Sequence, residues 1–166
     1  MTVPLSDGII VRKSDFKERM MMDKIKEQID TFVTEWQAIT MAYSDYARTI
    51  GINYTSLQVL KYITTIEDCT QKDICERSFL PKQTVNSIIT GFYKKGFVEL
   101  RELKEDRRTK SIHLTEAGQK YLESFFPHID ESEYQAMASL SEKERENLIH
   151  CIHSYGEKFR EMLMKE

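Results

Sequence analysis

Residues 82–95 combine an apolar pattern with hydrogen-bonding side chains that include no carboxylate. The apolar members recur at i, i+3, i+4 and i+7, the spacing of one face of an α-helix; they are Val85, Ile88, Ile89 and Phe92. The opposite face carries Lys82, Gln83, Thr84, Asn86, Ser87 and Thr90. Amide side chains pair with adenine in the major groove, lysine with guanine or phosphate, and hydroxyls with base edges or the backbone. The pattern therefore predicts a helix that reads double-stranded DNA.

A charged loop follows this segment and adds to a local excess of positive charge. Residues 82–110 carry 8 basic and 4 acidic side chains, whereas the whole chain has a net charge of −3. The stretches 97–101 and 111–114 alternate or run apolar as short strands do, so they predict a hairpin around the charged loop. The tip of this hairpin would bring basic side chains to phosphates or to the minor groove. These side chains are Arg107, Arg108 and Lys110.

A short helix precedes the polar segment. Thr70 can cap it, and Asp73 falls in its first turn, where the helix dipole favours a negative charge. Pro81 ends this helix and suits the first position of the next one. Helix, tight turn, helix and hairpin is the order of a winged helix-turn-helix, so we also expect DNA contacts from Thr70 and Gln71.

The rest of the sequence predicts helices that hold these elements in place. Gly and Pro number only 6 and 3 among 166 residues, too few for a β-sandwich or barrel. Apolar residues recur at steps of 4 and 3 from Ile25 to Ile50, and Gly51 stands where the C′ residue of that helix should. A capping box opens a last helix at Ser141, with a similar stripe over residues 148–162. Because no sheet is predicted to cover these stripes, we expect them to pack against a second copy of the chain.

Two further helices complete the prediction. The spacing of residues 55–58 predicts a capping box that opens one of them at Thr55. Thr115 is expected to cap a helix whose inner stripe is Leu122, Phe125, Phe126 and Ile129. The fold class is therefore mainly α with a small β-hairpin wing: a winged helix-turn-helix plus long N- and C-terminal dimerisation helices. We expect an N-terminal arm and dimerisation helix over 1–52, a DNA-binding domain over 53–118, and C-terminal dimerisation helices over 119–166.

The central motifs resemble those of the MarR family, the multiple antibiotic resistance regulators. Asp106-Arg107-Arg108 followed by Leu114-Thr115 fits the family pattern D-x-R-x5-L-T, and residues 84–86, 94–98 and 115–118 continue it. The resemblance covers about residues 25–165. It implies an obligate homodimer that binds a pseudo-palindromic operator, generally as a repressor, and that is often released by a small aromatic ligand or by thiol oxidation.

The resemblance also implies roles for two residues of the wing. Asp106 would hold Arg108 in place, and Arg108 would enter the minor groove. His113 is not part of the family pattern, and the sequence gives it no role.

Three candidate sensor sites can be weighed. The aromatic side chains Trp36, Tyr43 and Tyr46 would suit a pocket for a phenolic effector. Cys69 precedes a helix N-terminus, which lowers the pKa of a thiol, so a redox switch is an alternative; cysteines are more often simply buried. His150 and His153 lie three residues apart, but no third ligand accompanies them, so we expect a surface pair and no metal or other cofactor.

Other function classes find less support in the sequence. It contains none of the motifs G-x-G-x-x-G, H-E-x-x-H and G-x-S-x-G and no P-loop, so we do not expect an enzyme. A winged-helix module that docks proteins would need an apolar or acidic face in place of residues 82–90, and it remains the alternative. No apolar run approaches the roughly 20 residues of a membrane span, and no signal peptide is visible, so we expect a cytoplasmic protein with no membrane partner.

Overall fold

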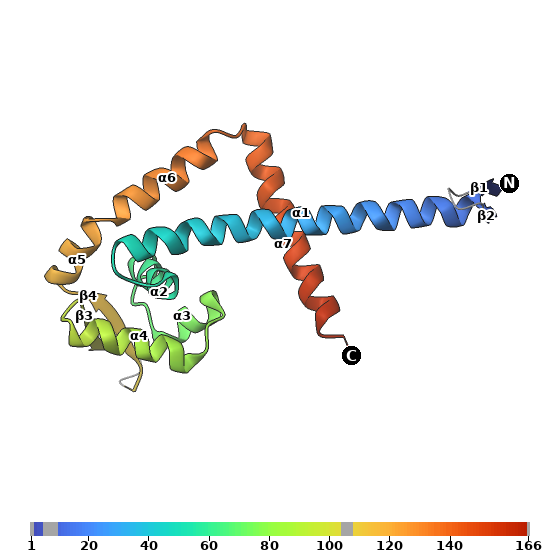
Figure 1. The fold of residues 1–166 in the computed structure, drawn as a ribbon. Coiled ribbons are helices and arrows are strands. Elements are labelled where there is room, and N and C mark those ends of the chain that lie inside the picture. Colours follow the sequence, from blue (N-terminus) through green and yellow to red (C-terminus); the bar gives the residue numbers. More distant parts are fainter. Residues whose placement is uncertain (1, 5–9, 104–107, 166) are drawn as a thin grey trace. The chain divides into compact units, whose positions relative to one another are not determined.

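The computed structural model describes residues 2–4, 10–103 and 108–165, with side chains described from residue 17 onward (Figure 1). The chain forms two compact units, residues 1–62 and residues 63–166. Among the described residues, no helix combines the length and the apolar character that a membrane crossing requires.

The first unit is built around one long helix. Strands β1 (Thr2–Pro4) and β2 (Ile10–Arg12) pair antiparallel and lead into α1 (Lys13–Thr49). Gly51 follows α1 with φ +76°, and the Ile52 N–H donates to the Ala47 carbonyl at 3.0 Å. This is the Schellman arrangement, in which a left-handed residue lets the chain satisfy the last helical carbonyls. The predicted helix end at Gly51 is confirmed.

Helix α2 (Tyr54–Thr65) begins earlier than the sequence predicted. Asn53 caps it, because its side-chain oxygen accepts from the Ser56 N–H at 2.7 Å. Asn is among the strongest N-cap residues, and its position one residue before the helix leaves no role for a cap at Thr55. The prediction that Thr55 opens this helix is therefore wrong.

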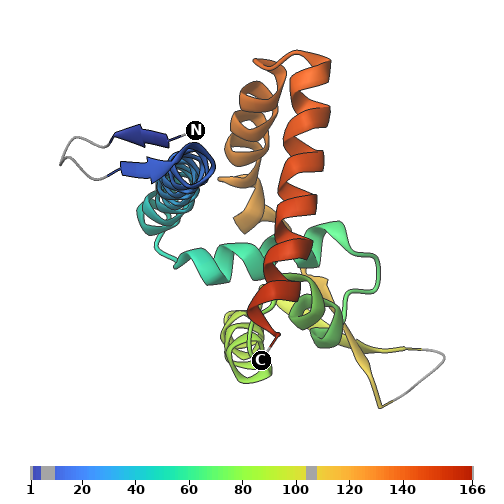
Figure 2. The same cartoon turned by 90° about the vertical axis from the view of Figure 1, so that its right-hand side faces the viewer.

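The second unit contains the helix-turn-helix and the wing. Its elements in chain order are α3 (Gln71–Ser78), α4 (Lys82–Lys94), β3 (Val98–Glu102), β4 (Lys110–Leu114), α5 (Glu116–Glu123), α6 (Phe126–Ala138) and α7 (Glu142–Leu163). Strands β3 and β4 pair antiparallel, with Val98 opposite Leu114 and Arg101 opposite Ser111. Helices α3 and α4 lie beside this hairpin (Figures 1 and 2). The predicted fold class, mainly helical with a two-stranded wing, is confirmed.

The core of the second unit is made by residues that the helical and strand periods picked out. The buried apolar side chains include Val85, Ile89, Phe92, Val98, Ile112, Leu122, Phe125, Phe126 and Ile129. The stripe after Thr115 is buried as predicted, but it is shared by two helices, α5 and α6, where the sequence predicted one. Pro127 stands in the first turn of α6. Proline has no N–H to donate to the carbonyl four residues earlier, that of Glu123, and its ring clashes with that carbonyl in a continuous helix, so α5 ends and Phe125 caps a new helix.

Gly118 lies where the start of α5 meets the start of β3. The Thr115 hydroxyl caps α5 by accepting from the Gly118 N–H at 3.0 Å, and it donates to the Gly96 carbonyl at 2.6 Å. The Thr115 N–H donates to the Phe97 carbonyl at 3.1 Å. A Cβ on Gly118 would overlap the same Phe97 carbonyl oxygen. Only glycine fits here, because the atom in the way is backbone and cannot rotate aside.

Gly118→Ala is therefore expected to destabilise the fold by about 1–3 kcal/mol, since the overlap forces the backbones apart. Gly91→Ala in α4 is the matched control, because a Cβ at Gly91 meets nothing within 4 Å; removing a glycine from a helix interior stabilises by up to about 1 kcal/mol. Urea unfolding followed by circular dichroism measures both free energies. A Gly118→Ala protein as stable as the wild type would contradict this account of the contact.

Candidate nucleic-acid interface

Helix α4 presents the polar face that the sequence predicted. Lys82, Gln83, Asn86, Ser87 and Thr90 are exposed, whereas Thr84 is half-buried. Pro81 is the N-cap, with φ −58° and ψ 139°, and the helix begins at Lys82. Pro81 thus stands one position outside the predicted N1 site, because its extended ψ keeps it out of the helix. The 13 residues of α4 include no carboxylate, so no negative charge on this helix opposes a phosphate.

Helix α3 is fixed at its start by a reciprocal cap. The Thr70 N–H and hydroxyl donate to one Asp73 carboxylate oxygen at 2.9 and 2.6 Å, and the Asp73 N–H donates back to the hydroxyl. These hydrogen bonds from Thr70 lower the pKa of Asp73. Gln71 then donates its side-chain N–H to the Lys82 carbonyl at 2.9 Å, which joins the start of α3 to the start of α4. Of the two predicted contact residues here, Thr70 therefore caps α3, and Gln71 links the start of α3 to the start of α4.

The structure brings the predicted contact residues of α3, α4 and the wing around one hollow of about 630 Å³. Among its lining residues are Thr70, Gln71, Lys82, Asn86, Thr90, Arg108 and Lys110. Gln83, Thr84 and Ser87 are not among them. Arg107 and Asp106 lie outside the described residues, in the loop that joins β3 to β4.

The hollow also has lining residues that sequence reasoning did not name as contacts, among them Lys72, Glu76 and Tyr93. Tyr93 lies seven residues after Asn86 and three after Thr90, so helical spacing alone places it on the same stripe of α4. That spacing could have identified Tyr93 as a member of the polar face, and its ring is half-exposed in the structure. Lys72 forms a 3.7 Å ion pair with Glu76 one turn later on α3.

The predicted effector residues all lie on α1, in the first unit. Trp36 is 54% exposed and has the ring of Phe32 at a centroid distance of 6.3 Å. Tyr43 and Tyr46 are half-buried, and the Tyr43 ring stacks on Tyr54 of α2 at 5.7 Å.

The two histidines weighed as metal ligands lie exposed on α7, and the His153 ring lies 3.4 Å from the carboxylate of Glu157. No group of three or more His, Cys, Asp or Glu side chains with the arrangement of a metal site occurs in the part of the chain that the structure describes.

Cys69 does not have the microenvironment that its place before α3 predicted. The side chain is fully buried, and burial is the main cause that raises the pKa of its thiol to about 11; the Asp73 carboxylate adds to this, and Arg77 opposes it. The expectation of a lowered pKa is therefore wrong, because desolvation of the thiolate outweighs the helix dipole. Of the other thiols, Cys75 is half-buried and Cys151 is exposed.

Comparison with known proteins agrees with this geometry. Residues 50–109 match the family model described as MarR family. The chain is 28% identical over 124 residues to the HTH-type transcriptional regulator SarZ of Staphylococcus epidermidis, covering 75% of this chain and 82% of SarZ. It is 26% identical over 104 residues to the HTH-type transcriptional repressor YetL of Bacillus subtilis, and the match covers 61% of this chain and 62% of YetL. Among solved structures, NMB1585, a MarR family regulator from Neisseria meningitidis, aligns with TM-score 0.71 and 26% identity, covering 82% and 96%.

The burial of Cys69 predicts selective thiol labelling. At pH 7.5 a thiol whose pKa is about 11 holds about a hundredfold less thiolate than one at the reference value of 9.0. We expect iodoacetamide to alkylate Cys151 in the folded protein while Cys69 stays unmodified until urea unfolds the chain. Peptide mass spectrometry over a time course measures both rates. Equal labelling of the two cysteines in the folded protein would restore the redox alternative.

Proposed function

This chain belongs to the MarR family of winged helix-turn-helix transcriptional regulators, and we propose that it represses transcription as a homodimer bound to a pseudo-palindromic operator. The observation that carries the proposal is the exposed, carboxylate-free face of α4, flanked by α3 and the wing around one hollow. The name of the relative YetL, a transcriptional repressor, supports repression over activation.

Each element has a part in the proposed complex. Helix α4 enters the major groove, where Gln83, Asn86, Ser87 and Thr90 reach base edges and Thr84 mixes base and backbone contacts. Lys82 neutralises a phosphate, and Thr70 and Gln71 contact the backbone from α3. The wing brings Arg107, Arg108 and Lys110 to the neighbouring minor groove, with Asp106 positioning Arg108.

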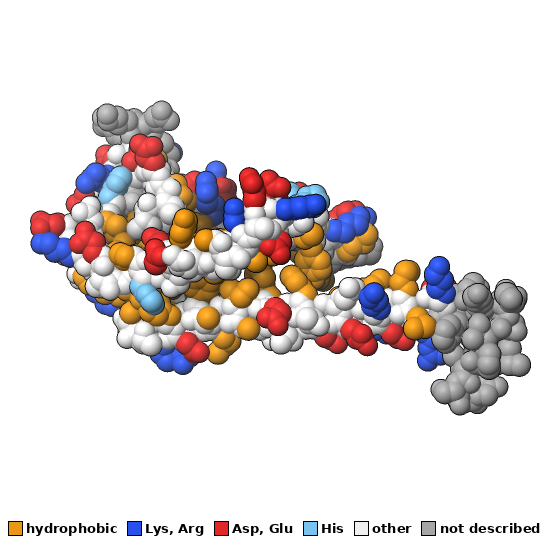
Figure 3. Space-filling model, turned by 90° about the horizontal axis from the view of Figure 1, so that it is seen from above, with side chains coloured by type: hydrophobic (Ala, Val, Ile, Leu, Met, Phe, Trp, Pro, Cys, Tyr) orange, Lys and Arg blue, Asp and Glu red, His pale blue; other side chains and the backbone are white. Residues whose placement is uncertain are grey.

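Exposed apolar stripes support the homodimer. Ile25, Ile29, Trp36 and Ile39 lie exposed on α1, with the orange side chains of Figure 3 spaced along that helix. Helix α7 exposes Leu148, Ile152, Tyr155, Phe159 and Met162, with the rings of Tyr155 and Phe159 stacked at 5.8 Å. Contiguous apolar faces of this length are costly in water and mark interfaces. A twofold-related copy would cover them and set two α4 helices about 34–36 Å apart, one turn of DNA.

Release of the operator by a small aromatic effector is the last part of the proposal. Trp36, Tyr43 and Tyr46 on α1 offer aromatic faces for a phenolic ring, and the exposed ring of Trp36 is accessible in the single chain. The fully buried, protonated thiol of Cys69 favours such a ligand over oxidation at Cys69 as the signal.

Two substitutions on α4 should separate phosphate contact from base reading, once an operator has been selected from genomic fragments. Lys82→Ala is expected to weaken operator and random DNA alike and to lower the salt slope by about one. Asn86→Ala is expected to cost about 1–3 kcal/mol on the operator and little on random DNA. Fluorescence anisotropy titrations at several salt concentrations measure both, with Lys143→Ala on α7 as the control for lost charge. Equal losses on both DNAs for every variant would mean that this face does not read sequence.

The homodimer can be tested by placing charges in the α7 stripe. Ile152→Glu with Phe159→Glu should give monomers at micromolar concentration, because both side chains are exposed in the single chain and carboxylates cannot be buried in the interface. Operator affinity should then fall by about tenfold or more, since only one half-site is held. Analytical ultracentrifugation measures the mass, and Asn147→Glu is the control on α7. A double variant that remains dimeric would reject α7 as the interface.

A further inference from the structure

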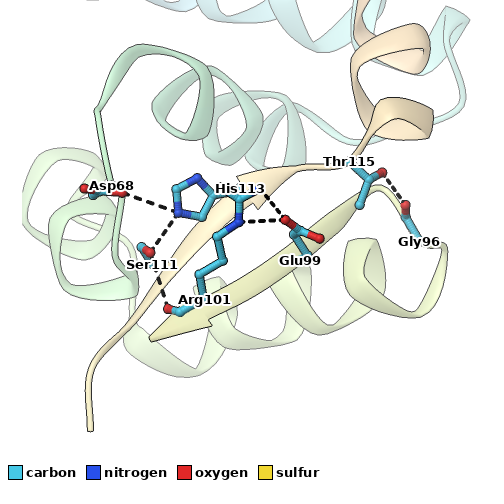
Figure 4. Close-up of polar contacts among 7 residues, drawn as sticks. All are labelled: Asp68, Gly96, Glu99, Arg101, Ser111, His113 and Thr115. Carbon is cyan, nitrogen blue, oxygen red and sulfur yellow. Dashed lines mark hydrogen bonds and ion pairs between the residues drawn. The ribbon is translucent and has the colours of Figure 1, made fainter. Parts of the chain in front are cut away.

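His113 lies where the base of the wing meets the turn between α2 and α3. It is on β4, opposite Glu99 of β3, and its side chain is 22% exposed. Its Nε2 lies 2.8 Å from the Ser111 hydroxyl and 3.5 Å from the carboxylate of Asp68 (Figure 4). Asp68 belongs to the turn and adopts φ +47°, a left-handed conformation that Asp tolerates better than most residues. One ring nitrogen thus faces both the wing and the turn.

The hydrogen bonds around Ser111 decide where the proton on the ring lies. The Ser111 hydroxyl is 3.3 Å from the Arg101 carbonyl, which can only accept, so the hydroxyl donates there. Its oxygen must then accept from His113, which places a proton on Nε2. The same N–H points toward the Asp68 carboxylate, whereas the other tautomer would aim a lone pair at it. Protonation of Nδ1 as well leaves these contacts in place and puts a positive charge beside Asp68.

Backbone contacts join the same two segments. The Ile112 N–H donates to the Cys69 carbonyl at 2.7 Å, and Thr70 forms a β-bridge with Ser111. The turn leads directly into α3, and β4 begins at Lys110, beside the described end of the wing loop. These contacts hold the wing in position relative to α3. Among them, the contact between His113 and Asp68 joins two ionisable side chains.

Several other charged groups around this junction have partners of their own, while Glu67 precedes Asp68 in the same turn. Asp73 on α3 accepts two hydrogen bonds from Thr70, and Lys72 pairs with Glu76. On β3, Glu99 pairs with Arg101 at 2.7 Å, and Glu102 lies opposite Lys110.

On α5, which contacts β4, Glu116 pairs with Lys120 at 2.7 Å. The hollow beside the junction, about 740 Å³, is lined by Asp68, Lys72, Asp73, Arg101, Glu102 and His113 among others. Within the described residues, Asp68 is the acidic group that forms an ion pair with the His113 ring.

We propose that His113 is a positioning residue for the wing, and that its protonated form fastens the wing to the α2–α3 turn through Asp68. This inference rests on the proposed DNA binding. Histidine changes charge between pH 5 and 8, a range in which carboxylates stay ionised. Only the ring that carries both protons makes an imidazolium–carboxylate pair with Asp68, so a pH-dependent hold on the wing is the outcome that tests the proposal. A wing held in place loses less freedom on binding, so operator affinity rises as the pH falls.

The test compares operator and random DNA at pH 6.0 and 8.0 and constant ionic strength, by anisotropy titration. The ratio of the two affinities removes the general effect of added positive charge. In the wild type this ratio should rise about two- to fivefold at pH 6.0, the size expected for a partly exposed ion pair. His113→Gln and Asp68→Asn should both abolish the rise. His128→Gln on α6, which removes a histidine elsewhere in the unit, should keep it.

Amide hydrogen exchange on the protein without DNA gives a second readout. After correction for intrinsic rates, protection of the Ser111 and Ile112 amides should be higher at pH 6.0 than at pH 8.0 in the wild type and equal in His113→Gln. A pH-dependent affinity ratio that survives in both His113→Gln and Asp68→Asn, or wild-type protection that does not change with pH, would overturn the proposal. If the wild type binds no DNA selectively at either pH, the proposed function fails, and exchange in the free protein still decides the role of His113.

Discussion

The first strand of the wing meets the first turn of α5 at a contact that leaves no space for a side chain on Gly118. The Phe97 carbonyl fills that space and accepts from the Thr115 N–H, while the Thr115 hydroxyl reaches the Gly96 carbonyl. These bonds hold the end of α4 and both ends of the hairpin together. Together with the buried apolar side chains of α4 and the hairpin, this close approach holds the polar face of α4 in its orientation relative to the wing.

Three acidic residues near the interface are engaged by neighbouring groups of the protein. Asp73 is committed to the cap of α3, and its lowered pKa reflects the hydrogen bonds that Thr70 donates. Glu99 is paired with Arg101, and Glu76 with Lys72. A chain with net charge −3 can therefore present a basic surface locally, since phosphates respond to the charges within about a Debye length rather than to the total.

The errors of the sequence reading share a physical cause. Asn53 rather than Thr55 caps α2, and Pro127 divides a stripe that reads as one helix, because several local signals compete within a few residues and the packing selects among them. Cys69 sits before a helix N-terminus, yet its pKa is raised. The dipole at that terminus is a small local effect, whereas the desolvation of a buried thiolate is larger and follows from contacts that no local pattern contains.

Periodicity, caps and turn residues determined most of the helices, the hairpin of the wing, the polar face of α4 and the apolar core of the second unit, because those signals act within one or two turns. They also supplied the family motif, and with it the expectation of a DNA-binding regulator. The hollow that joins Gln71, Asn86 and Arg108, and the contact of His113 with Asp68, were decided only by the tertiary structure. His113 and Asp68 stand 45 positions apart, and a polar side chain at such a distance gains its partner only when hydrophobic burial has already fixed the path of the backbone between them.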